Sequence, residues 1–225
     1  AEGLLLNHYR DQDLYAEYPE KLKEVKDKYM NLGQEKWQSN MYYGWLWTLQ
    51  GLLNEYGTGY PQFMQSVAWQ DKNLNTALGS WSQLKHDTVL YGKQSGAECG
   101  GGQEIPYVLG YVEPNLEVYE KLLWLNDFSR ENLSQRGLID GKLESKLYDF
   151  DRLLKFLIIC SKKELNNEAL TEKEYYKIQT YGGELEYLTS SLAGENGMRW
   201  YEITSETDKN IAVIADVHTL GDGSY

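Results

Sequence analysis

The chain has 225 residues, of which 41% are hydrophobic and 13% aromatic, and this composition is too rich in core-forming side chains for a disordered protein. Its formal net charge of −12 argues against binding to nucleic acid or to an anionic membrane surface, because both would repel the protein. A basic partner or a cation suits this charge better, and the alternative is that the charge only keeps the surface soluble.

The first strong helical pattern lies between Gln38 and Asn54, a stretch without any charged residue. Apolar residues recur there at spacings of three and four, which predicts a helix that is apolar on most sides and therefore largely buried. Gly44 and Gly51 lower helix propensity, so we expect them to mark close contact with a neighbouring helix. The positions that carry the pattern are Trp37, Met41, Trp45, Leu49, Leu52 and Tyr56.

A second largely buried helix is predicted from Asn73 to Gly92, with a stripe of Leu74, Leu78, Trp81, Leu84, Thr88 and Tyr91. Residues 116–135 and 143–163 have the pattern of ordinary amphipathic helices, with charges on the side opposite the apolar stripe. No run reaches about 18 apolar residues, so we expect no membrane insertion.

Another helix is predicted to begin at Thr171, because Thr171 and Glu174 form a capping-box pattern and Leu170 and Tyr175 a hydrophobic staple. After it the apolar period changes to that of strands, in "MRWYEIT" and "NIAVIADVHT". The expected fold is mainly α: a multi-helical body over residues 1–198 with two largely buried helices, and a small C-terminal β-hairpin over 199–225. An isolated hairpin is marginally stable, so this one needs to pack on the helices or on further strands.

The two cysteines, Cys99 and Cys160, are too few for a disulfide scaffold. Cys160 closes the run "LLKFLIIC" and is predicted to be a buried apolar residue, while a Cys99–Cys160 bridge stays open. The first residues lack the basic stretch and long apolar run of a signal peptide.

Two pairs of polar residues stand out in segments that otherwise look buried. His86 and Asp87 lie in the second predicted helix, and Asp216 and His218 lie two apart in a predicted strand, where both side chains share a face. If the hairpin packs on that helix, the four side chains form a candidate site for a divalent metal such as zinc, manganese or calcium. The alternative is that Lys85, His86 and Asp87 form a structural polar network and the strand pair is a cap or an interface.

A third candidate is the glycine-rich loop after Glu98 and Cys99, where backbone can approach a ligand closely. Cys99 is a candidate nucleophile if His86 serves as its base, and Glu98 and Glu113 are candidate general bases for a metal site. The alternative is an ordinary exposed loop. Zinc-protease, nucleophile-elbow and dinucleotide-binding motifs do not occur in the chain.

Three stretches carry a family resemblance: "LNTALGSWSQLKHDTVLYGKQS" at 74–95, "YVEPNLEVYEKL" at 111–122 and "IADVHT" at 214–219. Together they resemble domain-of-unknown-function family 3160 of prokaryotes. The resemblance implies a longer polypeptide that is commonly secreted or lipid-anchored, of which this chain looks like a C-terminal-side fragment. It supplies no established activity.

Two functions follow as hypotheses. The first is a noncatalytic extracytoplasmic module that binds a small ligand, glycan or peptide through a pocket lined by aromatic side chains and the loop of residues 98–103. The alternative is a metal-dependent hydrolase that uses the two histidine and aspartate pairs. A third, purely structural interpretation treats both pairs as internal contacts that stabilise the fold.

Overall fold

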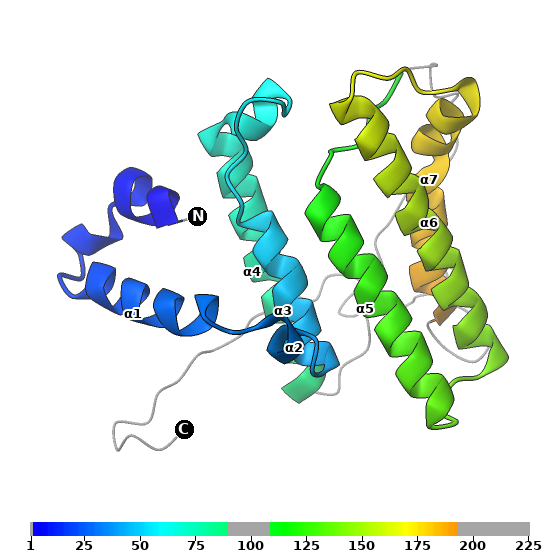
Figure 1. Cartoon of the computed structure of the whole chain (residues 1–225), viewed down its shortest axis with the longest axis horizontal. Coiled ribbons are helices and arrows are strands. Elements are labelled where there is room, and N and C mark those ends of the chain that lie inside the picture. Colours follow the sequence, from blue (N-terminus) through cyan, green and yellow to red (C-terminus); the bar gives the residue numbers. More distant parts are fainter. Residues whose placement is uncertain (1, 90–108, 193–225) are drawn as a thin grey trace, which may run out of the picture.

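The structure, a computed structural model, describes residues 2–89 and 109–192, and every regular element in these residues is a helix (Figure 1). The chain is thus mainly α-helical, as predicted. The predicted β-hairpin over residues 199–225 lies outside the described residues.

The elements are a π-helix η1 (Leu4–Tyr9), 3₁₀-helices η2 (Asp11–Asp13) and η3 (Gln62–Gln65), and α-helices α1 (Tyr18–Met30), α2 (Gln34–Trp37), α3 (Met41–Leu52), α4 (Val67–Val89), α5 (Leu116–Gln135), α6 (Gly141–Leu165) and α7 (Glu172–Leu192).

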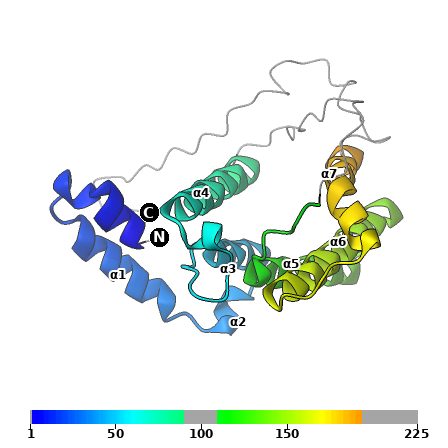
Figure 2. The same cartoon turned by 90° about the horizontal axis from the view of Figure 1, so that it is seen from above.

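The longer helices form an open row rather than a closed bundle (Figures 1 and 2). α4 packs on α3, α3 on α5, α5 on α6, and α6 on α7. Residues 2–30, which comprise η1, η2 and α1 and are called the arm below, lie beside α3 and α4 at one end of the row (Figure 1). No helix in residues 2–89 or 109–192 is long and apolar enough to cross a membrane.

The contact between α3 and α5 depends on small residues, as the sequence predicts. Gly44, Thr48 and Gly51 are the buried residues of α3 and recur every three or four positions on one face. A Cβ atom at Gly44 would lie 2.7 Å from Cζ3 of Trp124, and one at Gly51 would lie 2.9 Å from Cγ2 of Val118. Glycine therefore lets the two helices approach more closely than any other residue would.

The expectation of a largely buried helix is wrong for the described side chains of α4, whereas in α3 the exposed residues are Met41 and Tyr42, both in its first turn. Met41 of α3 is 47% exposed, and Leu78, in the predicted apolar stripe of α4, is 52% exposed. Among the described side chains of α4, the buried ones are instead Trp69, Asn73 and Ala77. Among the described residues the helices of the row pack on neighbours along the row, so part of an apolar surface that extends around α4 stays exposed.

α6 and α7 both begin at side-chain caps, of which the one at α7 is predicted from the sequence. The Asp140 carboxylate accepts a hydrogen bond of 2.7 Å from the backbone N–H of Leu143. At α7, the Thr171 N–H donates to Glu174 at 2.7 Å while the Glu174 N–H donates to the Thr171 hydroxyl at 3.3 Å, which confirms the capping box. Leu170 is buried and Tyr175 packs against the same core cluster, together with Val112, Cys160 and Ile178.

The segment between Leu109 and Asn115 is not helical, yet side-chain contacts hold it in place. The N–H of Val112 donates to the Glu164 carboxylate at 2.9 Å, and Tyr56 donates its hydroxyl proton to Asn115 at 2.9 Å. Pro114 is fully buried. This segment therefore ties the start of α5 to α6 on one side and to the end of α3 on the other.

Candidate binding cleft

The arm carries an apolar stripe that the fold leaves uncovered. In α1, Leu22, Val25 and Tyr29 are three and then four residues apart, so they share one face, while lysine, aspartate and glutamate occupy the others. Pro19 stands in the first turn, where its missing N–H costs no hydrogen bond. The structure describes all of α1, and none of its residues is buried; Val25 is 51% exposed.

This stripe forms one wall of a cleft of about 950 Å³ between the arm and the row of helices. The opposite wall comes from the end of α3, from α4 and from the first turns of α5. The apolar lining consists of Leu5, Leu6, Leu22, Val25, Tyr29, Met30, Leu53 and Leu74, and the polar lining of Glu2, Asn7, Lys26, Gln50, Asn54, Glu55, Glu117 and Lys121. The volume is at the upper end of the roughly 300–1,000 Å³ usual for ligand pockets.

The polar side chains of the cleft at α5 are already bonded to one another. Lys121 has a side chain only 10% exposed; its ammonium pairs with Glu117 at 2.6 Å and donates to the Trp47 carbonyl at 3.0 Å. The same ammonium lies 4.8 Å from the centroid of the Trp47 ring, within cation–π range. Asn54 donates to the second oxygen of Glu117 at 2.5 Å. The charge of Lys121 is therefore neutralised within the protein.

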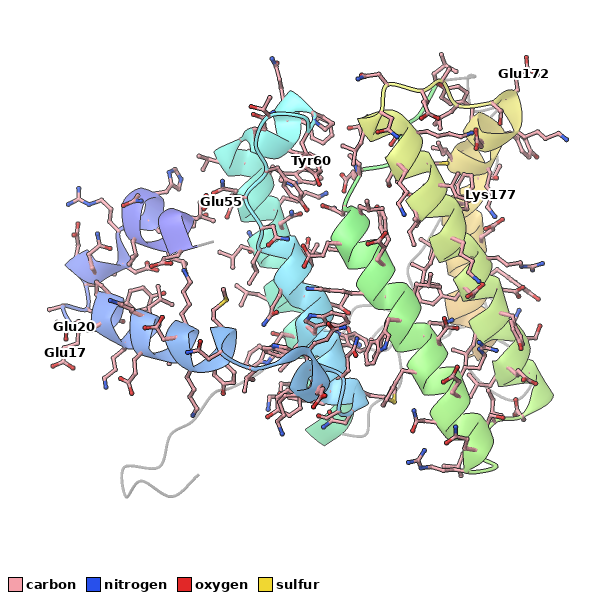
Figure 3. The ribbon with its side chains drawn as sticks, in the orientation of Figure 1. Glu17, Glu20, Glu55, Tyr60, Glu172 and Lys177 are labelled. Carbon is pink, nitrogen blue, oxygen red and sulfur yellow. The ribbon has the colours of Figure 1, made fainter. Side chains whose placement is uncertain are left out.

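A hydrogen bond at the C-terminal end of η1 holds the arm beside the row. Tyr9 donates its hydroxyl proton to Asp71 of α4 at 2.5 Å, and Gly3 lies close to Glu55, where an added Cβ would be 3.5 Å from the carboxylate. Figure 3 shows Glu55 on the side of the row that faces the arm. Within the arm, Lys26 of α1 forms an ion pair with Glu2, and the hydrogen bond from Lys26 lowers the pKa of the Glu2 carboxyl.

The arm is not among the predicted site segments, although its sequence carries a signal for an amphipathic helix. The stretch "YPEKLKEVKDKYM" has a proline in its first turn and apolar residues at helical spacing among charges, which together predict an amphipathic helix. The uncovered side of that helix could not be predicted, because it depends on where η1 and α3 lie.

Of the seven candidate site residues, Glu113 is the one whose side chain the structure describes. Its carboxylate accepts two hydrogen bonds from Lys72, at 2.6 and 2.7 Å, and Lys72 also lies 4.1 Å from the centroid of the Trp69 ring. Glu113 is 41% exposed and lies outside the lining of the cleft. Its carboxylate is therefore engaged in an ion pair at the surface.

The predicted metal site is not tested by the described residues. His86 and Asp87 belong to α4, close to its described end at Val89, but their side chains are not described. Glu98, Cys99, Asp216 and His218 lie outside the described residues. Among the side chains that the structure describes, no three of His, Cys, Asp or Glu gather in a way that could hold a metal ion. The four proposed metal ligands therefore stay a prediction.

Cys160 has the environment that its apolar neighbours predict. It is a free cysteine and is fully buried, and burial raises the pKa of its thiol to about 11. A thiol with a raised pKa is a poor nucleophile at neutral pH, because little thiolate is present. Cys160 therefore belongs to the core of α6 and α7, together with Val112 and Leu170.

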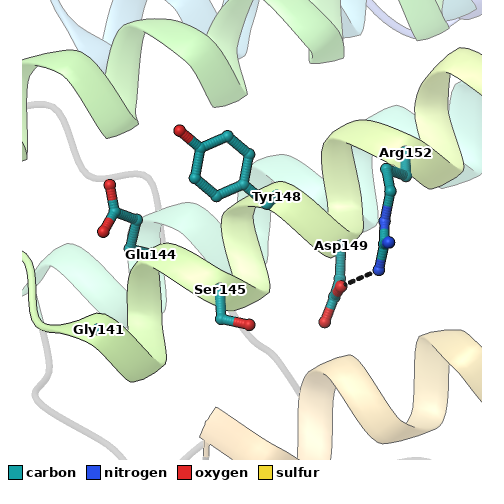
Figure 4. A pocket seen from close by; sticks show the side chains of 6 residues that line it. All are labelled: Gly141, Glu144, Ser145, Tyr148, Asp149 and Arg152. Carbon is teal, nitrogen blue, oxygen red and sulfur yellow. Dashed lines mark hydrogen bonds and ion pairs between the residues drawn. The ribbon is translucent and has the colours of Figure 1, made fainter.

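A second, shallower hollow of about 520 Å³ lies along α6 and is lined by Gly141, Glu144, Ser145, Tyr148, Asp149 and Arg152 (Figure 4). Arg152 pairs with Asp149 at 2.5 Å. Tyr148 accepts a hydrogen bond of 2.8 Å from Arg130 and stacks against its guanidinium group. The six described lining residues all come from one helix, whereas several elements line the cleft beside the arm, which is therefore the better candidate site.

Comparison with curated proteins and with solved structures gives no match to the chain. One family model does match, described as "Protein of unknown function (DUF3160)", and it covers residues 1–225. This match extends over both the arm and the row of helices, and over the three stretches in which the resemblance was first noted. The chain belongs to this family of proteins of unknown function.

Proposed function

We propose that this chain is a noncatalytic, extracytoplasmic module that binds a mainly apolar ligand or partner segment in the cleft beside the arm. One observation carries the proposal: the apolar stripe of α1 faces apolar side chains across about 950 Å³ of open cleft. Large exposed apolar surfaces rimmed by polar residues are typical of interaction sites. The location outside the cytoplasm rests on what the family resemblance implies.

The charges in the cleft disfavour an anionic ligand. Both lysines among its lining residues are paired with carboxylates, Lys26 with Glu2 and Lys121 with Glu117. An anionic group would have to displace one of these carboxylates or lie beside it, and either arrangement costs electrostatic energy. An apolar ligand gains the burial of the stripe without that cost.

The test is titration of the protein with Nile red, a neutral apolar dye that fluoresces strongly when it leaves water. Two charge-matched variants of the arm are compared: Val25→Asp changes the cleft wall, and Leu14→Asp changes a residue that is 80% exposed and does not line the cleft. We expect wild type and Leu14→Asp to bind the dye alike. Val25→Asp should weaken binding about tenfold, which corresponds to about 1.4 kcal/mol of lost apolar contact.

Val25→Asn serves as an uncharged polar variant, so that the loss can be separated from the added charge. Circular dichroism checks that each variant keeps its helices. Equal dye binding by wild type, Val25→Asp and Val25→Asn, with helicity intact, would remove the cleft as the binding site.

A further inference from the structure

We infer that the cleft is a docking groove for an amphipathic α-helix of a partner protein, one whose apolar stripe is flanked by basic residues. This inference rests on the proposed function and specifies the occupant of the same site. Three features support it: the shape of the walls, the hydrogen bonds within the cleft and the charge of the protein.

The wall made by the arm is long and narrow. α1 has 13 residues, which corresponds to about 20 Å at roughly 1.5 Å per residue. Its stripe runs from Leu22 to Tyr29 and so extends over about two turns, or about 10 Å. Leu53 and Leu74 line the facing wall, which α3 and α4 supply. Two facing walls of helical side-chain ridges suit a third helix, whose own ridges pack into the grooves between them.

Few hydrogen-bonding groups remain for an occupant at the α5 side of the cleft. Lys121 is engaged with Glu117 and Trp47, and Asn54 is engaged with Glu117. An extended peptide or a sugar that entered this region would bury donors and acceptors without partners, at a cost for each unpaired group. A helix already bonds its backbone groups internally, so it can present an apolar face without that cost.

Charge selects the sequence of the helix. The protein carries a formal net charge of −12, and the carboxylates of Glu2, Glu55 and Glu117 line the cleft against the two lysines. Glu17 and Glu20, at the end of α1 farthest from α2, add acidic groups to the arm (Figure 3). Lysine or arginine on the sides of the docked helix, outside its apolar stripe, would be attracted by the net negative charge of the protein, which favours encounter.

Three fluorescently labelled synthetic helices of about 14 residues, matched to the length of α1, test the inference by anisotropy. The first is built from leucine and lysine with the leucines on one face. The second has the same composition with the leucines distributed around the helix, and the third replaces lysine with glutamate. Titrations are run at about 0.15 M and about 0.5 M salt, because added salt screens nonspecific attraction to an acidic protein.

We expect the leucine–lysine helix to bind, and the scrambled and glutamate peptides to bind at least about tenfold more weakly. Val25→Asp should weaken binding of the first peptide, although added negative charge alone would strengthen attraction to a basic peptide; Leu14→Asp, with the same charge, should not weaken it. If the scrambled peptide bound as tightly as the first peptide, the inference that the occupant needs an apolar stripe would be wrong. If the glutamate peptide bound as tightly, the inference that basic residues flank the stripe would be wrong.

Two further outcomes separate this inference from the proposed function. Nile red binding that depends on Val25, without binding of any peptide, would overturn the helical occupant and leave the proposed function intact. A dimer in sedimentation velocity that Val25→Asp dissociates would also overturn the inference, because a second copy of the chain would then occupy the groove.

Discussion

Gly51 of α3 packs directly against Val118 of α5, at a distance where a Cβ atom would lie 2.9 Å from the Val118 side chain. Gly79 of α4 provides the matched case, because a Cβ there would meet nothing within 4 Å. Both residues lie within helices, so alanine improves helix propensity at each by up to about 1 kcal/mol. Only Gly51→Ala also forces two helices apart, since Val118 is β-branched and has few alternative rotamers.

We therefore predict opposite signs for the two substitutions. Gly79→Ala should raise the free energy of unfolding by about 0.5–1 kcal/mol. Gly51→Ala should lower it by about 1 kcal/mol, because an overpacking cost of roughly 1–3 kcal/mol exceeds the gain in propensity. Urea denaturation followed by circular dichroism measures both. Stabilisation by Gly51→Ala would show that α3 and α5 are not in close contact.

We predict that the negative charge of Glu164 lowers the stability of the folded protein. Burial raises its pKa above the ordinary value, against the opposing effect of the hydrogen bond from the Val112 N–H, and its second oxygen is buried without a partner among the described residues. Glu164→Gln keeps an acceptor for Val112 and removes the charge. We expect this variant to be more stable than wild type at pH 7 by up to about 1 kcal/mol.

The sign of the pH dependence follows from the raised pKa. The protonated carboxyl of Glu164 tolerates burial better than the carboxylate does. The free energy of unfolding is therefore highest below the pKa that Glu164 has in the unfolded chain, and it declines as the pH rises through the pKa of Glu164 in the folded protein. The advantage of Glu164→Gln should therefore disappear at low pH, where wild type is protonated as well. Thermal melts of both proteins across this range measure the difference, and an advantage independent of pH would contradict the assignment.

Glu174 should show the opposite pH dependence. Hydrogen bonds from Lys163, and then from Thr171, lower its pKa below the ordinary value of a glutamate. The stabilisation that these bonds give to the charged Glu174 is present above the pKa of Glu174 in the unfolded chain. It is lost as the pH falls through the lowered pKa of Glu174 in the folded protein. We expect Glu174→Gln to destabilise the protein at pH 7 but to match wild type once both side chains are uncharged.

Thr171→Ala tests the other half of this capping box. It should cost about 1 kcal/mol, because the N–H of Glu174 loses its acceptor. Chemical denaturation at neutral pH measures this loss. A variant as stable as wild type would show that the cap at α7 is dispensable.

The metal-site hypothesis also makes a direct prediction. If His86, Asp87, Asp216 and His218 hold a divalent ion, protein purified without chelator or metal-affinity tag should contain near-stoichiometric zinc, manganese or calcium. EDTA should then lower its melting temperature. His86→Ala and His218→Ala should each lose the metal, while His8→Ala, which changes an exposed residue of η1, should retain it. A metal-free protein without any response to EDTA would remove the metal-dependent hydrolase from consideration.

Helix boundaries that depend on residues close together in the sequence were predicted well. α5 was expected over residues 116–135 and is observed from Leu116 to Gln135, and α7 begins at the capping box of Thr171 and Glu174. A regular apolar period and a cap are properties of neighbouring residues, so both can be recognised in the sequence.

Which face of a helix is covered is a different kind of property. In α4 the periodic pattern pointed to Leu74 and Leu78, but the structure buries Trp69, Asn73 and Ala77. The cleft depends in the same way on contacts between distant residues, such as Tyr9 with Asp71. Such positions are determined by the arrangement of several elements, and no local pattern specifies them.

Because α1 is only shallowly buried, the arm should open at a lower free energy than the row of helices does. A helix that buries no side chain contributes little to the global free energy of unfolding, so its backbone hydrogen bonds can open while α5, α6 and α7 stay folded. In native-state hydrogen exchange, amides of the arm should therefore exchange long before those near Leu153 and Leu154, each only 1% exposed. A ligand that fills the cleft would add burial to the least protected part of the described chain and slow its exchange most.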